Sequence, residues 1–427
     1  MRKREGRLSM SNRYMREAVQ RKYLRDKVAT RAIRQRLVTF AETFPANSRK
    51  LEEIPYQHLQ IEDWLQLRLF LANIDTVILF YNSGLLDDFN LYWKSLGTHA
   101  NPVKIYRPLL DKLEVRHHKA LKYLSSFFRY IGKYDEAQGL IMRYLGTLDS
   151  NGTPQDDKRK EMAESYTSLA WIYYKSRDYD HAEEYQLKAL DLHEKIGTTA
   201  SRREQTNILN SLGVVYKAKG DLEKAEETHM RALALQEQVD FQEGVSWSLL
   251  NLGVVQRQRK NYKEAEVNFR RSIQIYQASV GTMHVNMSLR YNALARLYMD
   301  LEQFREAEEY FTKDLEVRKR ILGPKHADLG YPMSGLAELY HKMKSYDLSE
   351  SYYLQTLEIQ QKALGETHPV VGECWFELGM VLEDNGKAAK ASEAYTKALV
   401  ILQQQSGGKV PEGVLAKLKS KLGVSSE

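Results

Sequence analysis

The sequence predicts an all-α fold, a right-handed superhelical array of helix-turn-helix repeats preceded by a small helical block. Three observations predict it. A leucine followed by Gly or Ala recurs six times between residues 164 and 402, at intervals of 40 to 43 residues. A second small residue follows each leucine after 13 positions, and the apolar residues around each pair have the spacing of amphipathic helices. A fixed period held over six copies indicates a repeat array.

The six leucine pairs define the register of the array. They are Leu169-Ala170, Leu212-Gly213, Leu252-Gly253, Leu294-Ala295, Leu336-Ala337 and Leu378-Gly379. The second small residues are Ala182, Ala225, Ala265, Ala307, Ser349 and Ala391. Each copy predicts a helix A and a helix B, and we expect the small residues where the two helices meet, because only Gly, Ala or Ser lets their axes come close. Neighbouring copies must then stack to bury their apolar faces.

Three segments that join successive copies share a Gly and a His. They read "VGTMHVNMS", "LGPKHADLG" and "LGETHPVVG". The Gly is expected to end helix B. The histidines, His284, His326 and His368, recur about one period apart and cannot form a local ligand cluster, so we expect them in loop or inter-repeat packing.

The copies resemble tetratricopeptide repeats. In one copy the residues that match the family motif are Leu294, Ala295, Tyr298, Ala307 and Phe311. The copies depart from the motif at Gln256, Ser349 and Thr356. The long period is similar to the subclass typified by kinesin light chains and nephrocystin-3. This resemblance implies a superhelix whose concave groove is lined by helix A, and protein–protein interaction as the function.

Residues 1–110 are predicted to form the preceding helical block. Residues 11–44 are expected to form two helices, the first capped by Ser11 or Asn12 and the second by Thr30, with Ile33, Leu37, Phe40, Ala41 and Phe44 on the apolar stripe of the second. Within this block, "IPYQHLQIEDWLQLRLFL" and "LYWKSLG" resemble the helical region that follows a NACHT-type ATPase core. None of the Gly-Lys pairs is followed by Ser or Thr, so a P-loop is absent from this sequence. The resemblance therefore implies the C-terminal, regulatory portion of a longer signalling ATPase.

The remaining chain divides into three further parts. Residues 111–160 are predicted to hold a divergent first repeat and a polar loop, with Leu124, Phe128, Ala137 and Ile141 at the repeat positions. Residues 161–405 hold the six regular repeats. Residues 406–427 are predicted to hold a capping helix, because a terminal repeat needs a half-polar cover to stay soluble.

Charge and composition limit the classes of function. The first 36 residues hold 13 basic and three acidic side chains, a net charge of +10, and the whole chain carries +7. This basic arm leaves nucleic-acid binding open as an alternative, although its interleaved apolar residues favour a solvated helix pair. The single cysteine, Cys374, excludes a disulfide framework within the chain, and no apolar run reaches the length of a membrane span. We expect a cytoplasmic protein, and the nephrocystin-3 resemblance implies ciliary association.

No motif for catalysis or for metal or cofactor binding is found in the sequence, so we expect a non-enzymatic scaffold without a cofactor or small-molecule substrate. Its partner is expected to be a protein or peptide, acidic or carboxylate-bearing, because basic residues dominate the helix A positions that face the groove. Asn side chains there can hold a peptide backbone through both donor and acceptor atoms. The candidate groove residues are Lys175, Asn207, Asn210, Lys217, Trp247, Arg257, Asn292, Arg296 and Lys342.

Overall fold

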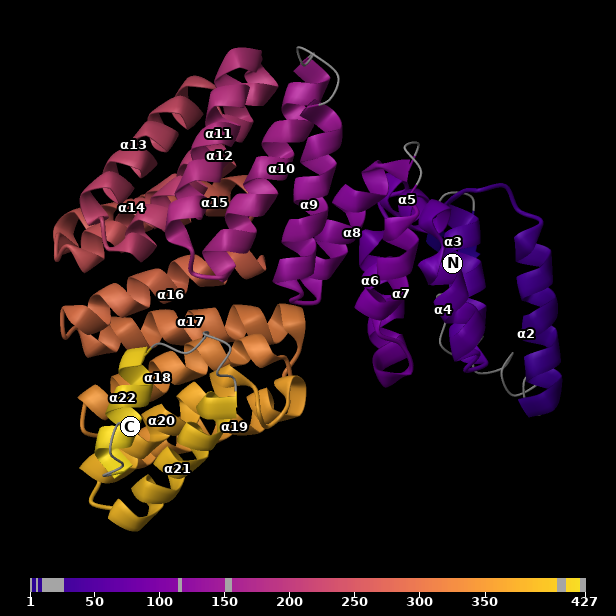
Figure 1. The fold of residues 1–427 in the computed structure, drawn as a ribbon. Coiled ribbons are helices and arrows are strands. Elements are labelled where there is room, and N and C mark those ends of the chain that lie inside the picture. Colours follow the sequence, from indigo (N-terminus) through magenta and orange to yellow (C-terminus); the bar gives the residue numbers. More distant parts are fainter. Residues whose placement is uncertain are drawn as a thin grey trace. The chain divides into compact units, whose positions relative to one another are not determined.

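The computed structural model describes residues 2–4, 7–9, 27–113, 117–149, 156–404 and 412–422. The chain divides into two compact units, Met1–Ile172 and Tyr173–Glu427, and the division falls within one helix, α10 (Asp156–Lys175). Apart from one short hairpin, the regular structure in the described residues is helical (Figure 1). The prediction of an all-α repeat array is thereby confirmed.

The first unit begins with the hairpin, in which β1 (Arg2–Arg4) pairs antiparallel with β2 (Arg7–Ser9). Its helices before α10 are α2 (Lys27–Glu42), α3 (Ser48–Gln60), α4 (Trp64–Ala72), α5 (Ile74–Asn82), α6 (Leu86–Leu96), the 3-10 turn η1 (Gly97–His99), α7 (Pro102–Asp111), α8 (Lys119–Tyr130) and α9 (Tyr134–Asp149). Of the two helices expected over residues 11–44, the first falls on residues 11–26, which lie outside the described residues.

Aromatic side chains fill the core of the first unit. Phe89, Trp93, Tyr106 and Phe127 are all buried, and their ring centroids lie 5.2 to 6.4 Å from one another in tilted or edge-on pairs. The Tyr106 hydroxyl donates to the Leu71 carbonyl at 2.6 Å, which satisfies the polar end of a fully buried ring. The core is therefore built from α4, α6, α7 and α8.

Two expectations for α2 are wrong. The helix begins at Lys27, so Thr30 lies inside it rather than at its cap. Its buried face holds Val38 and Ala41, which pack with Ile54, while Phe40 is 60% exposed and Ile33 and Leu37 are also exposed. The apolar stripe on α2 is wider than the face that α3 covers, and periodicity alone does not say which edge of a wide stripe is buried.

The second unit is a stack of antiparallel helix pairs in sequence order (Figure 1). Its helices are α11 (Tyr179–Ile196), α12 (Thr199–Lys219), α13 (Leu222–Gln238), α14 (Gln242–Gln258), α15 (Tyr262–Ser279), α16 (Val285–Asp300), α17 (Phe304–Leu322), η3 (Ala327–Leu329), α18 (Gly330–Lys342), α19 (Tyr346–Leu364), α20 (Pro369–Asp384), α21 (Ala388–Gln404) and α22 (Glu412–Leu422). Helices α12, α14, α16, α18 and α20 are helix A of successive repeats.

The register predicted from the sequence matches the packing. Every leucine of the six pairs is buried, and so is every second small residue, from Ala182 to Ala391. A Cβ atom built on Gly213 would lie 2.5 Å from the ring of His229, and one on Gly379 would lie 2.5 Å from the ring of Tyr395. Helix A therefore needs glycine at these positions because a ring of helix B lies directly against its backbone.

The turn between helix A and helix B has the same backbone in each regular repeat. The residue eight positions after each register leucine has a positive φ, from +57° to +84°. Glycine fills this position only twice. The six residues are Arg177, Gly220, Lys260, Glu302, Lys344 and Gly386. The turn is set by the packing of the two helices, since four copies adopt a left-handed conformation without glycine.

The recurring histidines cap helical turns. In each of His284, His326 and His368, Nδ1 accepts a hydrogen bond from the backbone amide two residues later, at 3.1 to 3.3 Å. These three bonds satisfy amide groups at the starts of α16, η3 and α20. The preceding glycines, Gly281, Gly323 and Gly365, all have positive φ and follow helix B, as expected.

Helix α22 packs against the last pair. Leu418 is fully buried in the cluster that contains Leu402, and Lys421 Nζ lies 2.6 Å from a Glu383 carboxylate oxygen. Among the described residues no single helix is long and apolar enough to cross a membrane; α4 and α5 reach that length only together, and they are bent by 74° at their junction.

Candidate partner-binding groove

A cleft of 390 Å³ lies between α12 and α14 and brings three predicted groove residues together. Asn207 and Asn210 line it from α12, and Trp247 lines it from α14. The other lining residues include Gln236 at the end of α13 and Phe241 in the following turn. This cleft lies along the helix A side of two successive repeats.

A chain of hydrogen bonds holds the polar wall of this cleft. His229 Nδ1 lies 3.0 Å from Asn210 Oδ1, Asn210 Nδ2 donates to Ser248 Oγ at 2.9 Å, and Ser248 Oγ donates to Gln236 Oε1 at 2.6 Å. His229, Gln236 and Ser248 are almost fully buried, whereas Asn210 is half-buried at the cleft. Burial lowers the pKa of His229 to about 4, and the nearby charge of Lys217 acts in the same direction. His229 is therefore neutral at physiological pH.

The aromatic wall of the cleft rests on a buried cation. The Arg290 guanidinium carbon lies 4.7 Å from the Trp247 ring centroid and 3.8 Å from that of Tyr276. Arg290 is fully buried, and its Nε donates to the hydroxyls of Ser246 and Ser272 at 3.0 and 3.1 Å. Burial lowers the pKa of Arg290 to about 10, so this guanidinium remains charged at neutral pH.

Two of the predicted basic groove residues are already neutralised by acids. Arg257 Nη1 lies 2.9 Å from an Asp300 carboxylate oxygen, and Arg296 Nη1 lies 3.3 Å from Glu338. Each pair joins helix A of one repeat to helix A of the next. His341 makes a third such contact, 2.7 Å from Asp384. Sequence spacing did not reveal these pairs because their members lie 42 or 43 residues apart.

Lys217 differs from these two arginines. It is half-buried near His229 and Arg257, and within the described part of the chain no ion pair or hydrogen bond to its ammonium group is found. Burial lowers its pKa, and the positive charge of Arg257 lowers it further. A cation held in this state gains more from an incoming anion than a solvated or paired one does.

The charged side chains along the groove change from basic to acidic toward its last repeats. Glu377 on α20 is half-buried near Glu338 and Glu373. Burial raises the pKa of Glu377 to about 7, and the two neighbouring carboxylates contribute to the rise. Two further acids at the end of α20, Glu383 and Asp384, already have partners, Lys421 and His341.

The remaining predicted groove residues lie elsewhere. Asn292 is half-buried and donates to the buried carboxylate of Asp314 at 3.0 Å, so its amide serves the packing of α16 on α17. Lys175 and Lys342 are exposed at the ends of their helices. Of the nine predicted residues, the structure gathers Asn207, Asn210 and Trp247 around one cleft.

Sequence reasoning missed Gln236 and Phe241, which also line the cleft. Three other repeats also have a buried polar residue at this position, 24 residues after the register leucine, so the sequence did not single out Gln236; these residues are His193, Arg318 and Gln360. Phe241 follows helix B in the shortest of the inter-repeat segments and has no counterpart in the motif.

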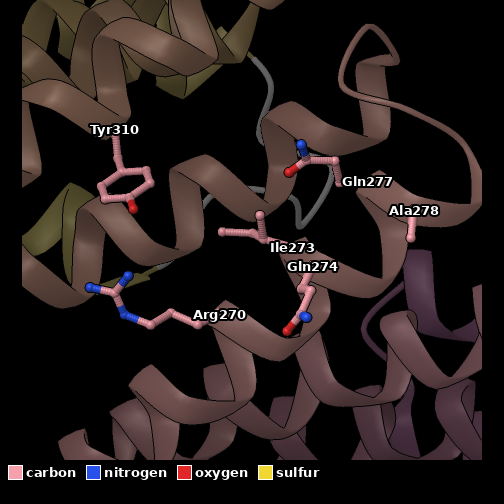
Figure 2. A pocket seen from close by; sticks show the side chains of 6 residues that line it. All are labelled: Arg270, Ile273, Gln274, Gln277, Ala278 and Tyr310. Carbon is pink, nitrogen blue, oxygen red and sulfur yellow. The ribbon is translucent and has the colours of Figure 1, made fainter.

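A second hollow, of 510 Å³, lies between two B helices. Arg270, Ile273, Gln274, Gln277 and Ala278 line it from α15, and Tyr310 lines it from α17. Arg270 and Tyr310 lie at one end, and Gln277 and Ala278 at the other (Figure 2). Arg270 is already bonded to Glu266 at 2.9 Å and to the Tyr298 hydroxyl at 2.5 Å, so its guanidinium is largely occupied.

Models of the tetratricopeptide repeat match residues 162–196, 204–278, 289–328 and 331–404, together more than half of the chain. This chain belongs to the tetratricopeptide repeat family. Repeats of this fold generally serve as non-enzymatic interaction scaffolds, and no catalytic family is indicated. A search of curated protein sequences returned no match.

Three solved structures show the same fold. The apo form of RapI is 13% identical, with a TM-score of 0.52 over 68% of this chain and 99% of RapI. The Rap conjugation gene regulator of plasmid pLS20, in complex with the Phr* peptide, is 15% identical, with a TM-score of 0.52 over 93% of this chain and 98% of that protein. A signal transduction ATPase with a tetratricopeptide repeat sensor from Pyrococcus horikoshii is 17% identical, with a TM-score of 0.51 over 96% of this chain and 57% of that protein.

A metal site and a nucleic-acid contact have less structural support than the cleft. Among the described residues, no group of three or more His, Cys, Asp or Glu side chains is placed to hold a metal ion. Most of the basic arm, proposed from the sequence as a nucleic-acid contact, lies outside the described residues.

Proposed function

We propose that the second unit binds an extended segment of a partner protein along its helix A groove, and that the cleft between α12 and α14 is the main contact. The observation that carries this proposal is the meeting of Asn207, Asn210 and Trp247 around one cleft. The exposed amide of Asn207 can donate to and accept from a peptide backbone, the amide of Asn210 is held in the polar wall, and the indole of Trp247 offers a large apolar face. The Rap regulator of similar fold is itself a complex with a peptide.

The acidic character of the partner is part of the proposal. The ion pairs already present in the groove limit the positions at which an acid would bind without competition. Arg257 and Arg296 each face a carboxylate of the next repeat, so an incoming acid would have to displace an existing ion pair. Lys217 has no such competitor in the described residues. We therefore expect the acid preference to depend on the region of Lys217 rather than on the whole groove.

The test is a peptide selection on the full chain, followed by affinity measurements on variants. A random dodecamer library is selected against the wild type, and Kd values of synthetic binders are measured by fluorescence anisotropy. Trp247→Ala is expected to weaken binding about tenfold or more, and Lys217→Glu is expected to weaken acidic binders preferentially. Lys342→Glu is the matched control, because Lys342 is exposed and lies away from the cleft.

Absence of any selected peptide, or binders whose affinity is unchanged in both Trp247→Ala and Lys217→Glu, would contradict the proposal. Asn207→Ala serves as a second cleft variant, because Asn207 is exposed and its truncation leaves the core intact. Thermal unfolding of each variant confirms that a loss of binding is not a loss of fold.

One observation favours a second candidate function, that of a regulatory part of a signalling ATPase. The ATPase from Pyrococcus horikoshii aligns with 96% of this chain, including the first unit, while the chain covers 57% of that protein. We extend this candidate to a NACHT-type protein of the nephrocystin-3 kind, similar to tetratricopeptide repeat protein 41. A cytoplasmic setting and ciliary association belong to the same proposal.

An antibody raised against residues 173–404 tests this candidate in native tissue. A natural polypeptide much larger than 49.6 kDa that binds nucleotide would support it. A single species of 49.6 kDa would contradict it and leave the scaffold as the function of the whole protein.

A further inference from the structure

We propose that the start of α14 is a carboxylate-binding site, the seat of one carboxylate of the partner segment. The inference rests on the proposed function and deepens it. Its ligand groups are the first backbone amides of α14 and the side-chain amide of Gln236, at the wall of the cleft that Trp247 and Phe241 also line.

The start of α14 is a helix terminus without a side-chain cap. Phe241 occupies the cap position and offers no hydrogen-bonding side chain, and the first intrahelical bond runs from the Val245 amide to the Phe241 carbonyl at 2.9 Å. The amides of Gln242, Glu243 and Gly244 precede that bond and have no intrahelical partner. Together with the positive end of a 17-residue helix, they favour an anion at this position.

The unpartnered side-chain nitrogen of Gln236 is a second observation, independent of the helix terminus. Its side chain is fully buried, it lines the cleft, and its Nε2 has no hydrogen-bond partner within the part of the chain that the structure describes. A Cβ atom built on Gly244 would lie 2.9 Å from this nitrogen, so the free donor lies beside the backbone of the first turn of α14. A buried amide without a partner costs free energy that an acceptor on a ligand would recover.

The polar chain behind the cleft agrees with a free nitrogen on Gln236. Ser248 Oγ accepts from Asn210 Nδ2 and lies 2.6 Å from Gln236 Oε1 and 3.0 Å from Asn210 Oδ1, so the shorter of its two donor contacts is to Gln236. In the tautomer that carries its proton on Nδ1, His229 donates to Asn210 Oδ1, and the chain then runs toward Gln236 Oε1. Gln236 therefore presents a donor, and the group that pairs with it must be an acceptor.

The charges around the cleft favour an anionic acceptor over a neutral one. Arg290 lies fully buried behind Trp247, its hydrogen bonds go to hydroxyl and carbonyl oxygens, and its Nη2 lacks a partner among the described residues. Arg203 lies over the ring of Phe241 at 5.6 Å. Glu243 is the one lining residue with a negative charge, and it is exposed in the first turn, where it can turn toward solvent.

The experiment measures the coupling between a ligand carboxylate and Gln236 in the full chain. Each carboxylate of a selected dodecamer is neutralised in turn, side chains by Asp→Asn or Glu→Gln and the C-terminus by amidation. Kd values are measured for wild type and for Gln236→Met, which keeps the volume and removes the donor. Gln360→Met is the matched control, because Gln360 holds the same register position, is also buried against a helix A glycine, and lies outside the cleft.

We expect one neutralisation to weaken binding to the wild type and to Gln360→Met about tenfold, and to weaken binding to Gln236→Met less than threefold. Sensitivity to amidation would identify a C-terminal carboxylate, and sensitivity to a side-chain change an internal Asp or Glu. Equal losses in wild type and Gln236→Met would overturn the inference. If those peptides still depend on Trp247 and Lys217, the proposed function survives; if no peptide binds at all, that function fails first.

Gly244→Ala is a second variant that tests the same site if Gln236→Met does not fold. Its added Cβ would crowd the Phe241 ring, at 2.4 Å, and the Gln236 nitrogen, and so close the site from the cleft side. The ring of Phe241 is only partly buried and can move aside. The same loss of carboxylate sensitivity is expected, and full retention of sensitivity would overturn the inference.

Discussion

Two helix pairs of the array, here called layers, have the same backbone arrangement but differ in the polarity of the side chains buried between their helices. In the layer of α12 and α13, the residues 17 and 24 positions after the register leucine are His229 and Gln236. In the layer of α20 and α21 they are Tyr395 and Leu402. All four side chains are buried. In both layers the ring 17 positions after the leucine lies against a glycine of helix A, and a Cβ atom built on that glycine would lie 2.5 Å from the ring.

The difference teaches that the repeat period fixes where a side chain lies and leaves open what it does there. The sixth repeat uses these positions for an apolar cluster that includes Leu378, Ala398 and Leu418. The second repeat fills them with polar groups, which is tolerated because they form one continuous chain of hydrogen bonds. That chain ends at the cleft with an unused donor, so the departure from an apolar core coincides with the candidate binding site.

The largest effect is expected in the apolar layer. Leu402→Ala should lower the free energy of unfolding by roughly 3 to 5 kcal/mol, because Leu402 is fully buried and its truncation leaves a cavity against Gly372. Urea denaturation measures the loss. Leu354→Ala, at a site that is 46% exposed, is the control and should cost less than about 1 kcal/mol. A comparable loss in both variants would mean that burial of Leu402 is not what stabilises the apolar layer.

The polar layer is expected to make stability depend on pH. The pKa of His229 is about 4 in the folded chain and near 6.5 in the unfolded chain, so between these values the unfolded chain binds more protons. Its contribution is therefore complete above pH 6.5 and is lost as pH falls toward 4, by about 3 kcal/mol at most. His229→Phe, which introduces the residue that the next repeat has at Phe269, should remove this dependence in urea denaturation measured from pH 4 to 7.5.

Glu377 provides a second check in the same experiment, because its pKa is raised by folding whereas that of His229 is lowered. Its pKa is raised to about 7 from an ordinary value of 4.5, so the folded chain binds more protons between these values and stability falls as pH rises through them. In His229→Phe, stability should therefore decrease from pH 4.5 to 7, and Glu377→Gln in that background should flatten the profile. An unchanged pH profile on adding Glu377→Gln to His229→Phe would contradict the assignment.

The smallest effect should be the same in both layers. Gly220 and Gly386 occupy the left-handed position of the helix A to helix B turn, with φ of +84° and +72°, and a Cβ on either would meet nothing within 4 Å. Gly220→Ala and Gly386→Ala should each cost about 1 kcal/mol, because the cost is purely conformational. Clearly unequal losses in thermal unfolding would mean that the two backbones are not equivalent.

Much of the fold followed from the sequence because it depends on local spacing. The leucine register, the small residues between helices A and B, and the glycines that end helix B were all predicted, and all lie where expected. The predictions were wrong where contact with a second helix decides which side chains are buried. On α2, the face that α3 covers holds the expected Ala41 together with Val38, which was not expected, and it leaves the expected Ile33, Leu37 and Phe40 exposed.

The candidate site was predicted less completely than the fold. Asn207, Asn210 and Trp247 were selected from helix A positions and do share one cleft. Arg257 and Arg296 were selected by the same count as free cations, and the next repeat supplies an acid to each. Gln236 was not selected, because nothing local distinguishes a buried glutamine with a free donor from one at a solvated helix end.

The sequence by itself determined the repeat, its period and the pairing of helices, since these depend on side-chain size and apolar spacing within a single repeat. Tertiary structure alone decided which charges are paired, which polar groups are buried and where a donor remains unused. Those properties depend on contacts between residues one repeat apart, and on the burial that makes an unpaired group costly. The function proposed for this chain depends on the second set.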